Sequence, residues 1–416
     1  MANTIKLPQL AWHGVKELNL SFPESWKVEV CNMEGYNRPR LIPAEIKKAI
    51  ASPIGITPLR EYARGKKEVV IIFDDMARVT RAAEIVPHVL EELAAAGIKD
   101  NQIRFIAACG CHGAMNRLDF SKKLGEDVLK RFPVYNHAPY DNCVYAGTTT
   151  RGTRVCINAE VMKCDLKIGI GSIVPHIMAG FGGGGKIVLP GVAAYETIVA
   201  LHSSRASSEQ AGFKDTVTGM GVFEDNPRRR DIDEAAAIVG LDVKIDAVVN
   251  MWGETVAIFA GAPTPAYAAA LEEAEAHYLT PAARDKDIVI ANTFAKANEA
   301  VSGLLVAFPS LSQQGGDVLL IANAPEGQIT HYLMGPFGNS IGGKLRLKMK
   351  PPPNVNRLII FSEYPEFSCK NYLEDADKLV LMHDWNDVLK LLQESHGSGA
   401  RVAVYPNADI QYCVVK

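Results

Sequence analysis

The sequence lacks an apolar run of the roughly 20 residues that a membrane-spanning helix needs, so no membrane partner is expected. Its first ten residues, MANTIKLPQL, hold no apolar stretch of the kind found in secretion signals, and we expect a cytoplasmic protein. Eight cysteines in 416 residues are too few for a disulfide scaffold. A strong charge of one sign is also missing, because the net charge is −3, and this argues against a nucleic-acid partner.

The chain does have enough length for more than one core. A chain of 416 residues predicts two domains. Apolar runs alternate with amphipathic stretches, which is the pattern of parallel βαβ units. In the first part of the chain we expect a helix at 81–97 and strands at 67–75, 102–109 and 165–171.

The same alternation restarts after a helix and a boundary within residues 261–287. Expected there are a helix at 385–395 and strands at 287–292, 317–324, 357–364 and 401–406. The sequence therefore predicts an α/β fold with parallel-rich, Rossmann-like sheets in two domains, residues 1–280 and 286–416. The active-site cleft is expected between these domains, with the catalytic groups on the N-terminal one.

Residues with reactive or charged side chains follow three of the predicted strands. Asp74, Asp75 and Arg78 follow the first strand, His112 follows the second, and the segment 172–186 follows the third. Ligands of parallel sheets bind beyond the carboxyl ends of the strands. The three groups of residues are therefore expected to converge on one crevice.

The third segment contains a glycine-rich loop, GFGGGGK at 180–186. Its spacing matches a phosphate-binding P-loop, but Ile187 stands where Ser or Thr would hold magnesium, which argues against nucleotide hydrolysis. Lys186 could be a phosphate-binding charge or a nucleophile. The loop is either a flexible turn or a cradle whose backbone N–H groups meet a cofactor phosphate at Gly182, Gly183, Gly184 and Gly185.

Three histidines stand at predicted loop or helix ends around this loop: His112, His176 and His202. Histidine can relay protons near neutral pH or bind a borderline metal, although a lone histidine is more often a satisfied polar residue. Cys109 and Cys111 lie beside His112, but they lack the paired C-x-x-C spacing of a structural zinc site. The histidines are therefore better candidates for chemistry than the cysteines.

Arg78 is the candidate for binding a substrate carboxylate, because its guanidinium can donate two parallel hydrogen bonds. The alternative is an ion pair with Asp74 or Asp75. These two carboxylates could also orient the arginine or bind a ribose hydroxyl of a cofactor.

Several of these segments together resemble the lactate racemase family. They are the run from Asp75 to Arg78, CGCHGAMN around His112, and NHAPYDNCVYAGTTTRGTRVCIN, IGIGSIVPHIMAGFGGGGKIVLPG and ETIVALH. The resemblance is dense over residues 67–205. It implies a racemase or epimerase that inverts C2 of a 2-hydroxy acid, with hydride transfer to and from a covalently bound nickel-pincer nucleotide.

The resemblance also implies a role for five residues. Lys186 would hold the cofactor covalently, and His202 would ligate its nickel. His112 and His176 would be general acid/bases on opposite faces of the substrate, and Arg78 would bind the substrate carboxylate. The implied partners are a small 2-hydroxy acid and the enzymes that build the cofactor; a homo-oligomer is compatible with the sequence.

Two other functions would use some of the same residues. A nicotinamide-dependent 2-hydroxyacid dehydrogenase would need a G-x-G-x-x-G turn between a strand and a helix with a ribose-binding acidic residue about 20 residues further on, and the sequence does not offer that combination. A non-catalytic nickel- or nucleotide-binding protein would keep Lys186 and His202, but it would have no use for Arg78, His112 and His176 together.

The sequence departs from the lactate-specific members in the segment ANTFAKANEAVSGLL, residues 291–305. Those members carry a Tyr-Gln pair and a Lys after a strand of the C-terminal domain. In an ungapped alignment, this chain has Ala300, Val301 and Leu304 at the positions of these three polar residues. Three polar residues lie near these positions in the sequence: Lys296, Asn298 and Glu299. We expect them to contact additional hydroxyls of the substrate. Lactate is therefore expected to be a poor substrate, and a longer or polyhydroxylated acid a better one.

Overall fold

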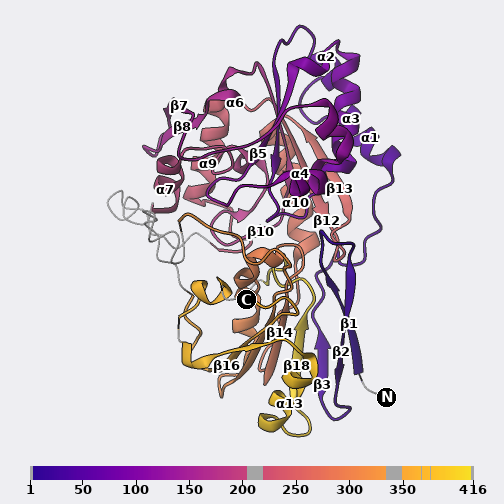
Figure 1. The fold of residues 1–416 in the computed structure, drawn as a ribbon, viewed down its shortest axis with the longest axis vertical. Coiled ribbons are helices and arrows are strands. Elements are labelled where there is room, and N and C mark those ends of the chain that lie inside the picture. Colours follow the sequence, from indigo (N-terminus) through magenta and orange to yellow (C-terminus); the bar gives the residue numbers. More distant parts are fainter. Residues whose placement is uncertain (1–2, 204–218, 334–348, 367, 375, 414–416) are drawn as a thin grey trace.

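The structure is a computed structural model that describes residues 3–203, 219–333, 349–366, 368–374 and 376–413. Two six-stranded sheets form its frame. Figure 1 shows the first sheet and its helices in the upper half and the second sheet in the lower half. The predicted α/β class with parallel-rich sheets is confirmed.

The first sheet has the strand order β13-β12-β9-β4-β5-β6. All neighbours in it are parallel except β12 and β13. From β4 the chain adds β5 and β6 on one side, and it then returns to add β9 on the other, so the strand order reverses between β4 and β9. The strands are β4 (Val69–Asp74), β5 (Ile103–Ala108), β6 (Val134–Asn136), β9 (Leu166–Ser172), β12 (Val243–Val249) and β13 (Thr255–Gly261).

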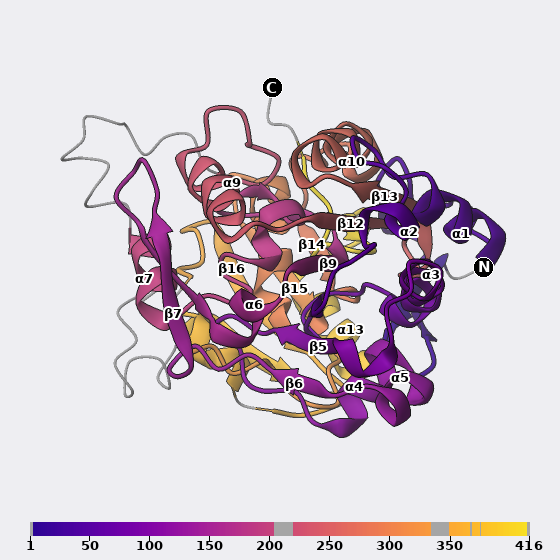
Figure 2. The same ribbon diagram turned by 90° about the horizontal axis from the view of Figure 1, so that it is seen from above.

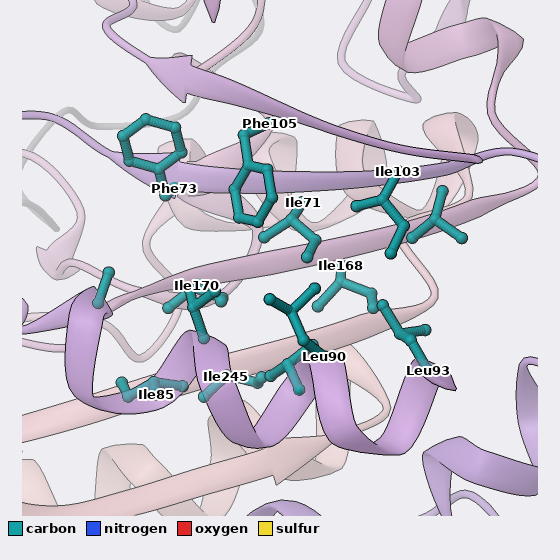
Figure 3. Packing of buried hydrophobic residues seen from close by; sticks show 14 of the residues in the cluster. Ile71, Phe73, Ile85, Leu90, Leu93, Ile103, Phe105, Ile168, Ile170 and Ile245 are labelled. Atoms are coloured by element: carbon teal, nitrogen blue, oxygen red, sulfur yellow. The ribbon is translucent and has the colours of Figure 1, made fainter. Parts of the chain in front are cut away.

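Helices cover both faces of this sheet, as Figure 2 shows from above. Residues of β4 alternate between two cores: Ile71 and Phe73 pack on one face, and Val70 and Ile72 pack on the other. Figure 3 shows the first of these cores, with side chains from α3 against the strands. The helices that contribute to that core include α1 (Pro43–Ala51), α2 (Leu59–Tyr62) and α3 (Ala82–Ala95). Those of the other face are α6 (Ala159–Lys163), α7 (Tyr195–Ser203) and α9 (Pro227–Val239).

The second sheet is parallel throughout, with the order β17-β16-β15-β14-β18-β3. Its strand order reverses between β14 and β18. Helix α13 (Trp385–Ser395) packs on one face. The strands are β3 (Lys27–Val30), β14 (Ile288–Asn292), β15 (Gly316–Ile321), β16 (Val355–Phe361), β17 (Leu379–Met382) and β18 (Arg401–Tyr405).

The start of the chain belongs to this second sheet. Strand β3 pairs with β18, so that Val28 lies opposite Val402. The hairpin of β1 (Asn3–Gln9) and β2 (Lys16–Phe22) packs its apolar side chains, Leu7 and Leu20 among them, into the core of that sheet. The domain limits 1–280 and 286–416 stay a prediction, but that division did not anticipate where the first thirty residues pack.

One core cluster joins the two halves of the molecule. It contains Val174 and Val248 from the first half and Phe294 and Ile410 from the second. Helix α10 (Pro263–Tyr278) contributes to the same cluster. Smaller elements complete the fold: α4 (Arg117–Leu124), α5 (Glu126–Arg131), α11 (Leu304–Ala307), β7 (Cys143–Thr148), β8 (Arg154–Asn158), β10 (Pro175–His176), β11 (Gly180–Phe181), and the 3-10 helices η2 (Gly184–Ile187) and η3 (Ala297–Gly303). Among the described residues, no helix has both the length and the apolar character to cross a membrane.

Candidate active site

A cavity lies at the carboxyl ends of β4, β5 and β9, next to the reversal of strand order in the first sheet. We call it the site cavity. Glu299 and His331 from the second half of the chain also line it. The expected convergence of three strand ends is confirmed, because the lining includes the predicted residues Asp74, Asp75, Arg78, His112, His176, Gly182, Gly183, Lys186 and His202.

His112 is held between two carboxylates. Its Nδ1 lies 2.5 Å from Asp75 Oδ2, and its Nε2 lies 3.3 Å from Glu299 Oε1. Burial alone would lower the pKa of His112, but the two carboxylates outweigh burial and raise this pKa to about 10. His112 is therefore an imidazolium at neutral pH in this state of the protein.

Arg78 lies on the other side of Glu299. Its Nη1 donates to Glu299 Oε2 at 2.8 Å and to the carbonyl oxygen of Ala77 at 2.5 Å. The local turn explains its position, since the Ala77 N–H donates to Asp75 Oδ1 at 3.0 Å directly after β4. The alternative of an Arg78 ion pair with Asp74 or Asp75 is wrong, because the guanidinium is paired with Glu299.

The two aspartates have separate protein partners. Asp74 accepts from the buried Lys123 ammonium at 2.7 Å and from the hydroxyl of Thr80. Asp75 accepts from His112 and from the Ala77 N–H. All four carboxylate oxygens thus have donors within the protein, and the binding of a cofactor ribose by these residues stays a prediction.

The contacts of His176 fix its tautomer and the charge of Lys186. In the hairpin of β10 and β11, Nδ1 of His176 accepts the N–H groups of Met178 and Ala179 at 3.1 and 3.3 Å. A neutral imidazole whose Nδ1 accepts carries its proton on Nε2, and this Nε2 lies 3.1 Å from Lys186 Nζ. Lys186 must then accept, so it is an uncharged amine.

Electrostatics agree with that assignment. Burial, and then the neighbouring charge of Arg78, holds the pKa of Lys186 well below its usual range. Burial likewise holds the pKa of His176 well below its usual range. An uncharged lysine amine is a nucleophile, whereas a phosphate-binding lysine would keep its charge.

His202 lines the site cavity, and among the described residues its Nε2 has no hydrogen-bond partner. Its Nδ1 donates to the carbonyl oxygen of Ile198, one turn earlier in α7, at 2.7 Å. Burial lowers the pKa of His202 to about 4, so the imidazole is neutral and Nε2 keeps its lone pair. Within the described residues, no group of three or more His, Cys, Asp or Glu side chains is arranged to hold a metal.

The glycine loop is shaped by its packing. Gly183 and Gly184 have φ of +72° and +55°, and a Cβ on either would overlap neighbouring side chains. The Gly182 N–H donates to Val174 O at 2.7 Å, and the Gly184 N–H donates to Asp246 Oδ2 at 2.9 Å. Both N–H groups therefore have partners inside the protein, and a phosphate contact at Gly182 to Gly185 stays a prediction.

Neither of the two other predicted substrate contacts, Lys296 and Asn298, is among the residues that line the site cavity. Asn298 lines a second, neighbouring cavity together with Trp12 and Gln328. Lys296 is buried, and burial and then Arg78 lower its pKa to about 8. Ala300 and Leu304 pack, with Val301 against them, into a core of the second sheet.

The sequence did not reveal how all charged residues of the site cavity are used. Glu299 was expected near the substrate but not as the partner of Arg78 and His112, and neither Lys244 nor His331 was expected to line the cavity. The rings of His331 and His112 meet edge to face at a centroid distance of 5.0 Å, and burial lowers the pKa of His331 to about 3. His331 belongs to no recognisable motif, whereas Glu299 was detectable as a carboxylate near a predicted strand end.

The fold and the cavity define an α/β protein with a cavity at the strand ends of its first sheet, lined by titratable residues from both halves. Comparison with known proteins then gives the family. Residues 13–213 match the family model for the lactate racemase N-terminal domain. The lactate racemases of Lactiplantibacillus plantarum and Thermoanaerobacterium thermosaccharolyticum are 30% and 29% identical over 290 and 289 residues, 68% of this chain and 66% of each relative.

Two solved structures share the fold. The lactate racemase apoprotein of T. thermosaccharolyticum matches with a TM-score of 0.71 at 22% identity, over 99% of this chain and 100% of that one. A protein from Thermotoga maritima matches with a TM-score of 0.65 at 18% identity, over 91% and 100%. The chain belongs to the lactate racemase family, and the resemblance identified from its sequence is confirmed.

Proposed function

We propose that this protein is a racemase or epimerase that inverts C2 of a 2-hydroxy acid and uses a nickel-pincer nucleotide bound to Lys186. One observation carries the proposal: Arg78, His112, His176, Lys186 and His202 line the same cavity. Family membership supports the class of reaction.

The residues fit such a cofactor at two points. Lys186 is an uncharged amine facing the cavity, the form that could attack the carbon of a thiocarboxylate arm and join it as a thioamide, with the carboxyl oxygen leaving as water. His202 offers a neutral imidazole whose ring is oriented by the hydrogen bond from Nδ1 to the carbonyl oxygen of Ile198. Histidines that ligate metals commonly make such a bond with their other ring nitrogen. When bound, the nucleotide would supply the hydride acceptor for C2.

Arg78 is suited to hold the substrate carboxylate. Its Nη1 is occupied by Glu299 and Ala77, and among the described residues no partner of Nε or Nη2 is found. That edge of the guanidinium can donate two parallel hydrogen bonds to a carboxylate. The C2 hydroxyl would then point toward one histidine in one enantiomer and toward the other in its mirror image.

The two histidines begin in opposite states, His112 charged and His176 neutral. A pair in opposite protonation states can give a proton on one face of the substrate and take one on the other. To accept a proton at Nε2, His176 must first carry its own proton on Nδ1, which breaks the contacts from Met178 and Ala179. A lysine joined to the cofactor would no longer be the amine that accepts the Nε2 proton, and this would favour the change.

The substrate we propose is longer or more hydroxylated than lactate. Ala300, Val301 and Leu304 belong to a core and not to the cavity, so they offer no polar contact in place of the Tyr-Gln pair and the Lys. Within the described part of residues 291–305, the cavity lining comes from Glu299.

The test is a stereochemical assay. Protein produced together with the cofactor-building enzymes should interconvert the enantiomers or epimers of at least one 2-hydroxy acid. Chiral chromatography measures this with lactate, glycerate, malate, phenyllactate and gluconate as substrates. Protein that carries the cofactor mass and inverts none of these acids would contradict the proposal.

A further inference from the structure

Glu299 occupies a central position in the site cavity. Its two carboxylate oxygens face different partners: Oε2 accepts from Arg78 Nη1 at 2.8 Å, and Oε1 lies 3.3 Å from His112 Nε2. These are the proposed carboxylate-binding residue and one of the two proposed acid/bases. A substrate that contacts Arg78 and His112 must therefore also lie against Glu299.

The carboxylate of Glu299 is charged in this state. Burial would raise its pKa, but Arg78, His112 and Lys296 outweigh burial and hold the pKa well below its usual range. A carboxylate accepts hydrogen bonds and cannot donate any. Glu299 should therefore strengthen binding of a substrate that places a hydrogen-bond donor beside it and weaken binding of one that places an anion there. An apolar group should gain no hydrogen bond from it.

The chemistry of the substrate identifies that group. Arg78 takes the C1 carboxylate, a histidine takes the C2 hydroxyl, and the next atom along the chain is C3. We propose that Glu299 determines specificity by accepting a hydrogen bond from a hydroxyl on C3, so that the preferred substrates are 2,3-dihydroxy acids. This assignment rests on the function proposed above, and it names the substrate class of the same site.

Three small acids separate the possibilities, because they differ only at C3. Glycerate carries a C3 hydroxyl, lactate carries hydrogen in its place, and malate carries a carboxylate there. Glu299 should favour glycerate over lactate and lactate over malate. A hydrogen bond to a charged group changes affinity about 10- to 100-fold, and we expect a glycerate-to-lactate ratio of kcat/KM in this range.

The experiment compares this ratio in cofactor-loaded wild type, Glu299→Gln and Glu299→Ala. Glu299→Ala should bring the ratio close to 1, whereas Glu299→Gln, which keeps an acceptor oxygen, should retain part of it. Glu299→Gln should also improve malate relative to lactate, because the anion is gone. The ratio is the readout because loss of a neighbour of His112 can slow all substrates alike.

Glu326→Gln is the matched control. Glu326 is also a carboxylate paired with a histidine and a lysine, His13 and Lys122, but it lines the second cavity. Its replacement should leave the glycerate-to-lactate ratio unchanged.

Calorimetric binding of glycerate and lactate to the cofactor-free protein separates this proposal from the proposed function. Suppose that binding favours glycerate only when Glu299 is present, and that cofactor-loaded protein inverts none of the acids. This result would support the role of Glu299 and contradict the proposed racemase activity. A ratio that is the same in wild type and Glu299→Ala, in turnover and in binding, would overturn the role of Glu299. Equal gains for all three acids in Glu299→Ala would also overturn it, since Glu299 would then only compete for Arg78.

Discussion

At the scale of single residues, the most informative one is Lys186, an amine that accepts a hydrogen bond from His176 Nε2. Lys186→Ala should remove both the cofactor mass and the activity, because no nucleophile remains for attachment. Intact-mass spectrometry of protein made with the cofactor-building enzymes measures this. Lys296→Ala is the control: Lys296 is another buried lysine with a lowered pKa, and the mass increment should persist there. An increment that survives Lys186→Ala would place the attachment elsewhere.

His202 should be required for retention of nickel. Its Nδ1 is fixed on Ile198, and in the part of the chain that the structure describes its Nε2 has no hydrogen-bond partner. Removal of a metal ligand typically weakens metal binding strongly. His202→Ala should therefore lose most of its nickel on dialysis, measured by elemental analysis. His331→Ala removes a second histidine from the same cavity and should keep the metal. Equal nickel content in the two variants would count against ligation by His202.

The protonation state of His112 gives a pH prediction. Its pKa of about 10 lies above the ordinary value of 6.5, so the ion pair with Asp75 stabilises the protein fully below about pH 6.5 and is lost as the pH rises through about 10. Asp75→Asn should lower this pKa, because it removes a carboxylate charge that raises it. Histidine-selective NMR titration measures the change, and His137, a buried histidine with a pKa of about 4, should not respond. A His112 signal that titrates near pH 6.5 in wild type would refute the imidazolium assignment.

The sequence predicted the residues of the cavity better than the contacts between them. Arg78, His112, His176, Lys186 and His202 could be found because they belong to long motifs or follow predicted strands. Glu299 could not be identified as the partner of two of them, because its contacts reach across 187 and 221 positions of the chain. Such pairings depend on how the two halves pack, and no local pattern encodes that.

At the scale of helices and strands, the alternation of apolar and amphipathic segments was sufficient to place most of the sheets. The strand expected at 67–75 is β4 at Val69–Asp74, and the helix expected at 81–97 is α3 at Ala82–Ala95. Strand β12 was not predicted, although its sequence VKIDAVV is buried throughout. Lys244 and Asp246 interrupt the apolar pattern there, and they form a buried ion pair at 2.6 Å that supports the glycine loop.

That support leads to a prediction about the loop. A Cβ at Gly184 would meet both a positive φ of +55° and the side chains of Arg229 and Tyr267, whereas a Cβ at Gly240, with φ of +72°, would meet open space. Gly240→Ala should cost about 1 kcal/mol from the backbone alone. Gly184→Ala should cost clearly more, as a larger fall in the thermal unfolding temperature measured by calorimetry. Equal falls would show that the loop tolerates a side chain.

At the scale of the whole molecule, the second sheet includes an edge strand from the other end of the chain. A fragment of residues 286–416 would leave the β18 edge and the face covered by Leu7 and Leu20 exposed to water. We expect this fragment to aggregate, and we expect a version with residues 1–33 fused to it to stay monomeric in size-exclusion chromatography. A soluble, monomeric fragment without the added residues would show that the N-terminal strands are dispensable for this sheet.

The pairing of β3 with β18 also affects the order in which the protein can fold during synthesis. Val28 leaves the ribosome long before its neighbour Val402, which is made 374 residues later. At about 5–20 residues per second, the first strands wait for tens of seconds before their sheet exists. During that time the first sheet, which β4 to β13 supply without a break, can form beside an unpaired hairpin. The carboxylate of Glu299 can therefore reach Arg78 and His112 only after the first sheet and its glycine loop have been synthesised.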